Sequence, residues 1–287
     1  MDPEMGHGRK VTITSANSLV GRGLLGLLAG TSAETFALVR RPVELPADHL
    51  ISGWMTSGAA AGAITDAGVV VHLSGEISAR SEAEYDAANV ETTRRVADHL
   101  RAGQRVVFIS YTGADPNSGN PFLRAKGKAE ALLRESPAAT FIFRTQIIAH
   151  HPSQPGPFEE AVRQPKSGGK VRVIGDGRSK VRPILQDDVL ATVVSVASGR
   201  GRPGTYDLVG VEELTMDDIV RHVNGRQDIS ISHVPGWIAR ILGRFVPDLS
   251  PAFVDLFLRR PLPGDPTRAI EEFDLELTPV TSVWRRA

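Results

Sequence analysis

The chain has 287 residues, 33 lysines and arginines against 33 aspartates and glutamates, and no cysteine. This length allows one substantial domain, or one domain with a smaller lobe. The balanced charge gives no sign of a nucleic-acid partner, and the lack of cysteine excludes disulfides, thiolate nucleophiles and thiolate metal ligands. Because no apolar run could span a bilayer and no signal-peptide pattern opens the chain, the sequence predicts a cytoplasmic protein.

Residues 1–9 are expected to be a disordered lead-in or tag. From Lys10 onward, short β-rich runs alternate with helical patterns, and a long helix is expected over 82–102. The expected strands cover residues 11–14, 35–39, 50–54, 69–73, 105–110 and 140–144. Their spacing predicts βαβ units and therefore a Rossmann-type, doubly wound α/β fold with a parallel sheet.

Beyond Arg144 the chain becomes rich in proline and glycine, and short strands mix with helices. We therefore expect a Rossmann dinucleotide-binding domain over 10–149, to which 178–200 returns, and a substrate-binding lobe over 150–177 and 201–287. Strands are expected in this half at 171–174 and 181–185. Asp187 is expected to open a helix over 189–198, and Thr215 to cap the next one with Asp218.

A helical stripe follows in the predicted lobe. Its apolar members are Trp237, Ile238, Ile241, Leu242 and Phe245, with Arg240 and Arg244 off the stripe. We expect this stripe to pack into the core of the lobe, and the alternative is a face for a partner or a membrane surface.

The turn after the first expected strand resembles a glycine-rich dinucleotide-binding fingerprint, G-x-x-G-x-x-G. Ser15, Ser18 and Gly21 occupy its three glycine places, so only the glycine that lets helix pack on strand remains. Asn17 tolerates a left-handed backbone, and the unpaired N–H groups of the following helix can still hold a phosphate. We expect cofactor contacts from Ser15, Asn17, Ser18, Leu19 and Val20, with binding that is weakened or absent if the serines close the turn.

Two arginines, Arg40 and Arg41, end the second expected strand. An acidic residue there would bind a ribose diol, whereas arginine suits a 2′-phosphate, so the pair favours NADP(H) over NAD(H). The alternative is two solvated surface arginines.

Five segments in collinear order carry a family resemblance. They are HLSGE (72–76), NVETTRRVADHL (89–100), FISYTGADPNSGNPFLRAKGKAE (108–130), FRTQII (143–148) and VIGDGRSKVRPILQDDVLA (173–191). From about residue 10 to 284 the chain resembles the atypical or extended short-chain dehydrogenases/reductases. This group is similar to NAD(P)H-binding, epimerase- and dehydratase-like proteins and to the nucleotide-binding accessory subunit of respiratory complex I.

The resemblance implies chemistry by a tyrosine and a lysine spaced Y-x-x-x-K, and here those places hold Phe122 and Lys126. Phenylalanine cannot transfer a proton, so the catalytic motif is degenerate. The resemblance still implies that Lys126 binds the nicotinamide ribose and that Thr112 orients a substrate carbonyl. Tyr111 is a candidate for the missing acid, and the alternative is a loop tyrosine that stacks over the cofactor or the lobe.

The resemblance also implies further cofactor contacts. These are Leu73, Ser74, Gly75, Asn89, Ser110, Lys126, Thr145 and Ile148. Trp54 stands where the family places an aspartate for the adenine, so it either stacks on the base or fills its pocket. Glu76, His150 and His151 are candidate acids or bases at the cleft with surface positions as the alternative, and adjacent histidines diverge too much to predict a metal site.

Three functions follow from these expectations. The leading one is an NADP(H)-dependent oxidoreductase that acts on a small or medium organic substrate such as a secondary metabolite. The others are a redox-neutral cyclase, isomerase or dehydratase, and a non-catalytic nucleotide-binding sensor or assembly protein. A small-molecule substrate is expected as partner, an oligomer is compatible with the sequence, and nucleic acid is not expected.

Overall fold

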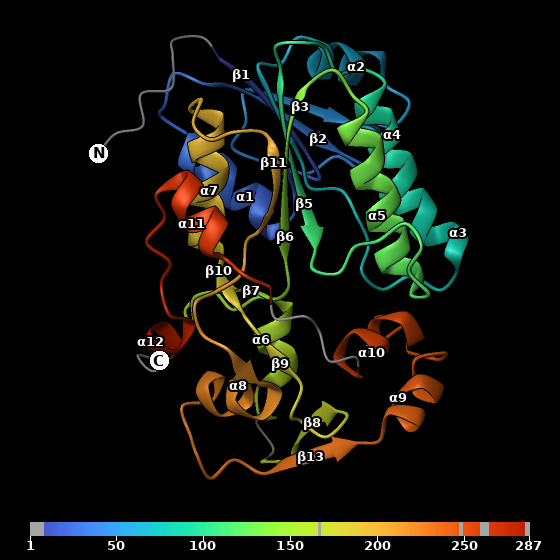
Figure 1. The fold of residues 1–287 in the computed structure, drawn as a ribbon, viewed down its shortest axis with the longest axis vertical. Coiled ribbons are helices and arrows are strands. Elements are labelled where there is room, and N and C mark those ends of the chain that lie inside the picture. The colour runs from blue at the N-terminus through green and yellow to red at the C-terminus, as the bar shows by residue number, and fades with distance from the viewer. Residues whose placement is uncertain (1–8, 166–167, 247–248, 259–263, 285–287) are drawn as a thin grey trace.

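The computed structural model describes residues 9–165, 168–246, 249–258 and 264–284. Its centre is a seven-stranded sheet in the order β11-β6-β5-β4-β1-β2-β3, with parallel pairing throughout (Figure 1). The strands are β1 (Lys10–Thr14), β2 (Glu34–Val39), β3 (His49–Ser52), β4 (Val69–His72), β5 (Arg105–Tyr111), β6 (Ala139–Thr145) and β11 (Gly204–Asp207). The expected Rossmann-type α/β fold is thereby confirmed, with each expected strand shifted by no more than a residue or two.

Helices cover both faces of this sheet (Figure 1). One face carries α1 (Leu19–Leu28), α7 (Gln186–Ala197) and α11 (Thr267–Phe273), whereas the other carries α2 (Gly58–Thr65), α4 (Thr92–Ala97) and α5 (Pro121–Arg134). The helix expected over 82–102 is instead composed of α3 (Glu82–Tyr85), a π-helical segment η1 (Asp86–Glu91) and α4. A π-helical turn inside a helix often marks a functional position, and this one contains Asn89.

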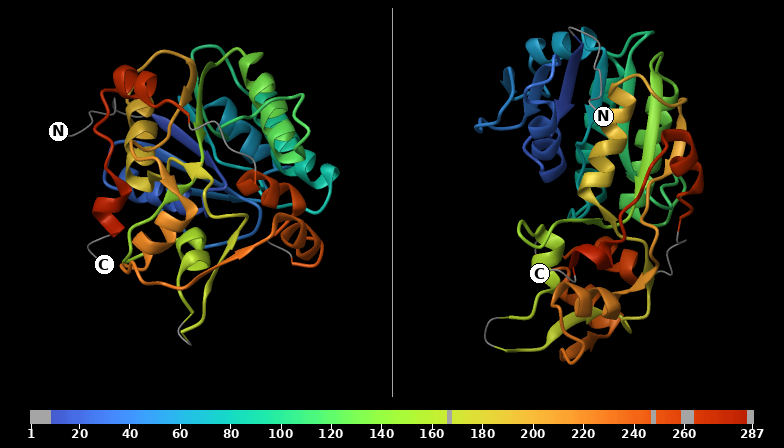
Figure 2. Two further views of the ribbon diagram at one scale, coloured as in Figure 1. Left: turned by 60° about the horizontal axis from the view of Figure 1, so that its bottom comes forward. Right: turned by 90° about the vertical axis from the view of Figure 1, so that its left-hand side faces the viewer.

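The lobe lies beyond the carboxyl ends of the central strands (Figures 1 and 2). It pairs β7 (Ile148–Ala149) with β10 (Ile184–Leu185), β8 (Val171–Ile174) with β13 (Ile231–Val234), and β9 (Lys180–Val181) with β12 (Leu214–Thr215). Its helices are α6 (Pro157–Val162), α8 (Met216–Val223), α9 (Gly236–Leu242), α10 (Pro251–Leu258) and α12 (Val280–Trp284). No helix within the described ranges is long and apolar enough to cross a membrane.

The part of the chain after Arg144 differs from the expectations in two places and agrees with them in a third. Strand β11 and helix α11 fall in the segment 201–287 assigned to the lobe, yet β11 pairs with β6 at the edge of the central sheet. Helix α11 packs on that sheet, where its Phe273 contacts Tyr206 and Phe143. The strand expected over 181–185 is divided into β9 and β10. Thr215 caps α8 in a reciprocal capping box with Asp218, as predicted.

The apolar stripe of α9 is not part of the core. Trp237 is 64% exposed and Phe245 79% exposed, so the expectation of a buried stripe is wrong. The reason is that α9 packs through its small residues: Ala239 is buried, and Gly236 and Gly243 lie against Leu258 and Leu249.

Candidate functional site

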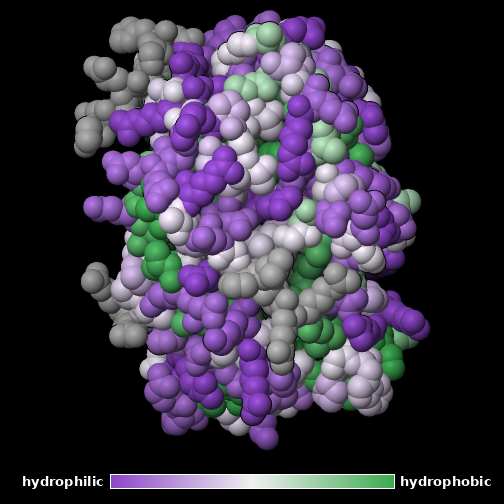
Figure 3. Space-filling view, viewed as in Figure 1, coloured by the Kyte–Doolittle hydropathy of each residue, from purple (hydrophilic) through white to green (hydrophobic). Residues whose placement is uncertain are grey.

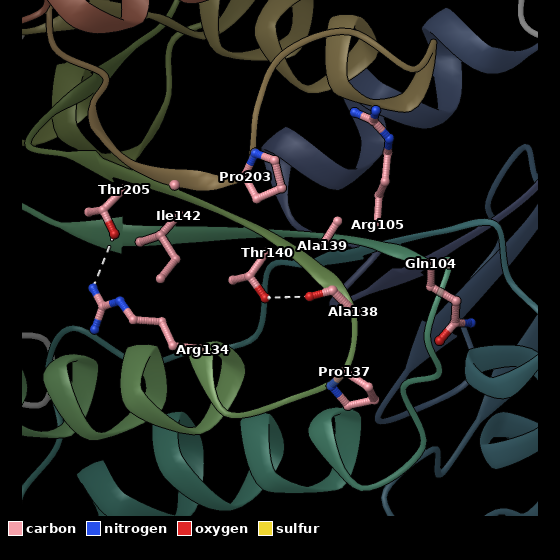
Figure 4. A pocket seen from close by; sticks show the side chains of 12 residues that line it. Gln104, Arg105, Arg134, Pro137, Ala138, Ala139, Thr140, Ile142, Pro203 and Thr205 are labelled. Carbon is pink, nitrogen blue, oxygen red and sulfur yellow. Dashed lines mark hydrogen bonds between the residues drawn. The ribbon is translucent and has the colours of Figure 1, made fainter.

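A cavity of about 430 Å³ lies at the carboxyl ends of β1, β2 and β4, where an open α/β sheet binds its ligands. Its lining includes Ser15, Arg40, Trp54, Ser74 and Gly75. A hollow of about 690 Å³ lies at the opposite, amino ends of β5 and β6, where the side chain of Arg134 reaches the Thr205 hydroxyl (Figure 4). The topology favours the first cavity as the functional site, because parallel strands place their ligand-binding loops at their carboxyl ends.

The serine-substituted turn keeps the backbone that glycine would give. Ser15 itself has φ 47°, in the left-handed region, whereas Asn17, which would tolerate that conformation, does not adopt it. Gly21 retains its packing role, since a Cβ on it would lie 2.6 Å from the carbonyl oxygen of Ala16. Ser18 caps α1 by accepting a 3.1 Å hydrogen bond from the Gly21 N–H.

The turn differs from a glycine-rich turn in carrying the hydroxyl groups of Ser15 and Ser18. Ser15 Oγ lies 3.0 Å from Ser74 Oγ, so the loops after β1 and β4 are joined by side chains. Leu19 is exposed and Val20 is half-buried at the start of α1. A phosphate at this helix terminus would therefore lie beside a hydroxyl pair and the Ser18 cap.

The two arginines after β2 separate. Both side chains are exposed, but Arg40 lines the cavity and Arg41 is not among the lining residues. Trp54 is only 1% exposed and packs in the core cluster with Leu38 and Ile64 while lining the cavity. Of the two sequence interpretations of Trp54, the burial of its ring favours a filled adenine pocket.

Lys126 and Asn89 converge on Gly75. A Cβ built on Gly75 would lie 2.7 Å from Asn89 Oδ1 and 2.9 Å from Lys126 Nζ, so only glycine leaves this space. The Asn89 amide nitrogen donates to the carbonyl oxygens of Glu76 (3.1 Å) and Tyr85 (3.0 Å). Its Oδ1 is buried and has no hydrogen-bond partner in the part of the chain that the structure describes. A buried acceptor without a donor is costly, which marks this point as one where a ligand or water belongs.

Lys126 itself is buried. Its Nζ donates to the carbonyl oxygen of Ile109 (3.1 Å) and lies 4.6 Å from the centroid of the Phe108 ring. Burial lowers the pKa of Lys126 to about 8, partly offset by the charge of Glu130. Lys126 therefore keeps its proton at neutral pH but releases it at a lower pH than a free lysine does.

His72, which the sequence analysis did not select, supports the same loop. Its ring joins the hydroxyls of Thr14 and Thr93 at 2.9 Å each, and Thr14 Oγ1 accepts hydrogen bonds from the N–H groups of Leu73 and Ser74. Burial, with a smaller effect of the Lys126 charge, lowers the pKa of His72 to about 3 and keeps it neutral. The sequence did offer a signal for His72, because it is the one polar residue in the otherwise apolar run VVVH.

Phe122, expected in the place of a catalytic tyrosine, lies in a closed aromatic cluster. Phe122 is buried, with its ring centroid 5.4 Å from that of Tyr111 and 6.2 Å from that of Tyr85. Helix α10 covers this cluster through Ala252 and Leu256. Its start is held by hydrogen bonds from Asn120 Nδ2 to the Ala252 carbonyl oxygen (2.9 Å) and between the Tyr85 and Ser250 hydroxyls (2.8 Å).

The hydroxyls expected beside the nicotinamide are engaged elsewhere. Ser110 donates to Glu130 Oε1 (2.6 Å), and Thr112 donates to the carbonyl oxygen of Thr145 (3.2 Å). The Thr145 hydroxyl in turn donates to the Ser110 carbonyl oxygen (3.3 Å). Burial raises the pKa of Tyr111 to about 12, the opposite of what an activated tyrosine needs.

Two buried carboxylates were missed by the sequence analysis. Glu130 is fully buried and binds Arg134 (2.6 Å) and Arg144 (2.7 Å) as well as Ser110. Glu159 accepts from the His150 backbone and lies 3.2 Å from His150 Nδ1. Neither shows any periodic signal, because a buried acid is recognised only from its partners.

Two of the remaining expected residues lie apart from the cavity lining. Ile148 is in β7 and pairs with Ile184, and His151 is exposed and contacts Ser153. Glu76 is exposed and lines the cavity. The described residues contain no group of three or more histidines and acids placed to hold a metal ion.

The protein has the fold of the NAD-binding epimerases, with a cavity at the carboxyl edge of its sheet. The solved structure of UDP-glucuronic acid 4-epimerase from Bacillus cereus in complex with NAD matches with a TM-score of 0.73 and 14% identity, covering 96% of both chains. The Bordetella bronchiseptica enzyme WbmH in complex with NAD⁺ matches with a TM-score of 0.75 and 17% identity, covering 98% of this chain and 97% of that one.

Two curated proteins match in sequence, and both are "NADH dehydrogenase [ubiquinone] 1 alpha subcomplex subunit 9, mitochondrial". The Arabidopsis thaliana protein is 25% identical over 74% of this chain and 56% of its own length. The Dictyostelium discoideum protein is 22% identical over 88% of this chain and 73% of its own length. The chain thus spans little more than half of the first relative, and no family model matches it. These matches confirm the resemblance to epimerase-like short-chain dehydrogenases and the complex I subunit.

Proposed function

We propose that this protein binds a nicotinamide dinucleotide, NADP(H) in preference to NAD(H), as a sensor or assembly subunit that does not perform tyrosine-dependent hydride transfer. One observation carries the proposal. Lys126 and the unpartnered Asn89 Oδ1 converge on Gly75, while the proton-donor place next to them is Phe122 beneath α10.

The residues present fit the bound part of such a cofactor. The Asn89 oxygen accepts and the Lys126 ammonium donates, which is the pair that a ribose hydroxyl requires. The start of α1 supplies N–H groups for a phosphate, and a cavity of about 430 Å³ is within the usual size of ligand sites. Arg40 in the lining supports a preference for the 2′-phosphate of NADP(H).

The lack of proton chemistry is supported by the surrounding contacts. Phe122 has no exchangeable proton, and the hydroxyls of Ser110 and Thr112 donate to Glu130 and to the backbone. Tyr111, with a pKa raised to about 12, is a poor acid at neutral pH. The curated relatives are named as subunits, which favours a role in a larger assembly.

A second function, a redox-neutral cyclase, isomerase or dehydratase, is favoured by one pair in the lobe. Glu159 holds His150 through Nδ1 at 3.2 Å, and His150 Nε2 is buried without a partner among the described residues. A carboxylate that orients an imidazole in this way is the usual support of a general base.

Titration of the purified protein with NADPH and NADH tests the proposal through the fluorescence of the reduced nucleotide. We expect NADPH to bind more tightly, and Arg40→Ala to reduce its affinity to that of NADH. Arg41→Ala is the matched control and should leave the preference intact, because Arg41 is exposed outside the cavity lining. If neither nucleotide binds at millimolar concentration, or if NADPH is consumed with a carbonyl substrate, the proposal fails.

A further inference from the structure

Half of the exposed large hydrophobic residues in the described chain lie in one ten-residue stretch of the lobe. They are Trp237, Ile241, Leu242, Phe245 and Val246, and we call them the α9 patch. The other exposed apolar residues are scattered over the surface. In Figure 3 hydrophobic side chains reach the surface in the region of α9 and α10. Such a concentration marks a binding surface, whereas single exposed apolar residues are ordinary.

Helix α9 turns its small residues toward the protein and its large apolar residues toward the outside, the reverse of a helix that packs on a core. Its inward side consists of the half-buried Gly236 and the buried Ala239 and Gly243, and these small residues let α9 approach α10 closely. Arg240 fixes this arrangement by an ion pair of 2.7 Å with Asp255 of α10. Because the small residues face inward, the five side chains of the α9 patch stay exposed in the part of the chain that the structure describes and are available to an external surface.

The composition of the stretch identifies the kind of surface. From Gly236 to Val246 the sequence GWIARILGRFV has no acidic residue, and Arg244 is exposed. A tryptophan and a phenylalanine beside arginine are typical of helices that lie in a lipid interface, where the rings enter the headgroup region and the cations meet anionic lipids.

A second copy of this chain fits less well. A stable protein interface uses about 20–30 residues a side, whereas this patch is one short helix and its following turn. A symmetric pairing would also place Arg244 near its own copy, and like charges oppose contact.

We propose that the α9 patch inserts into the interfacial region of an anionic lipid bilayer and so holds the protein at a membrane surface. This goes beyond the proposed nucleotide binding and is independent of it. The cation of Arg244 lies toward the headgroups and the α9 patch lies toward the acyl chains, whereas Arg240 keeps its ion pair with Asp255.

The chain contains its own reporter for this proposal. Of its three tryptophans, Trp54 and Trp284 are each 1% exposed and Trp237 is 64% exposed. With vesicles of phosphatidylcholine and phosphatidylglycerol, we expect the Trp237 emission to shift to the blue and its quenching by acrylamide to fall. Vesicles of phosphatidylcholine alone should produce a smaller effect, and added salt should weaken binding to the anionic ones.

Variants separate insertion from other causes. Phe245→Ser should weaken co-sedimentation with anionic vesicles about tenfold, since burial of one such ring contributes roughly that factor. Arg244→Glu should weaken binding to anionic vesicles only. Leu27→Ser, at an exposed position on α1, is the matched control and should change nothing.

The proposal is overturned if Trp237 stays open to acrylamide with both kinds of vesicle, or if Phe245→Ser and Leu27→Ser bind alike. It is also overturned if the protein self-associates without lipid and Phe245→Ser disperses it, because the occupant is then a second copy.

Discussion

The two halves of the candidate site, the turn after β1 and the helix α5, differ in how much of the expected pattern they keep. At β1 the side chains have changed, yet Ser15 holds the left-handed backbone and Gly21 the close packing of the glycine-rich turn. At α5 Lys126 is present, but Phe122 stands where the resemblance implies an acid, and the hydroxyls of Ser110 and Thr112 are engaged in other hydrogen bonds. The backbone shape that suits nucleotide binding can therefore persist where the side chains needed for proton transfer do not. The first depends on the backbone of the turn, and the second depends on a few side-chain atoms.

Substitution of Glu130, a buried carboxylate on α5, should have the largest effect on stability. Glu130→Ala removes the partner of Ser110, Arg134 and Arg144, so it leaves Arg144 without its buried counter-ion. We predict a loss of about 3–5 kcal/mol in the free energy of unfolding, measured with urea. Glu82→Ala, which removes an exposed ion pair with Arg124, should cost less than about 1 kcal/mol. Equal losses would contradict this account of the buried carboxylate.

The pH dependence of unfolding tests the burial of Lys126. Its pKa is about 8 in the folded protein and 10.5 as a free side chain, so between these values the unfolded chain binds more protons. Lys126 therefore lowers stability below pH 8, and this penalty disappears as the pH rises toward 10.5. Relative to Lys126→Met, the native protein should gain roughly 3 kcal/mol over this range.

Lys128→Met is the control for that measurement, because Lys128 is partly exposed and pairs with Asp86. Relative to this variant, the native protein should show no such rise. A flat difference for Lys126→Met as well would mean that Lys126 is hydrated in solution.

Gly75→Ala should change nucleotide binding without removing any group that could transfer a proton. The added methyl enters the space between Asn89 Oδ1 and Lys126 Nζ, and we predict about tenfold weaker NADPH binding, measured by nucleotide fluorescence. Gly62→Ala, in α2 with nothing near its Cβ position, should leave binding unchanged. Unaltered affinity in Gly75→Ala would move the nucleotide away from this loop.

Phe122→Tyr should have the smallest effect. Restoring the hydroxyl under α10 should change NADPH affinity less than about twofold, because the hydroxyl lies among Tyr85, Tyr111 and Leu256 and not in the cavity lining. No carbonyl-dependent consumption of NADPH should appear. Turnover in this variant would show that the α5 half lacks only one atom for catalysis.

The sequence predicted the sheet well because buried parallel strands such as VVVH and RVVFIS are apolar throughout. It also predicted that Lys126, Asn89 and Gly75 share one site, although only the structure shows the unpartnered amide oxygen. It did not predict the outward face of α9, since a helical period of apolar residues does not reveal that Gly236 and Ala239 supply the packing surface. Buried acids such as Glu130 depend on distant partners and leave no local pattern.

The return of β11 to the sheet has a consequence for how the molecule unfolds. Its residues Gly204–Asp207 pair with Phe141–Arg144, so the chain leaves the sheet for the lobe, comes back, and leaves again. A chain shortened before residue 204 would leave β6 as an edge strand, with N–H and C=O groups free to pair with strands of other molecules. The lobe therefore cannot be cut away by a single break, and sheet and lobe should melt as one cooperative unit.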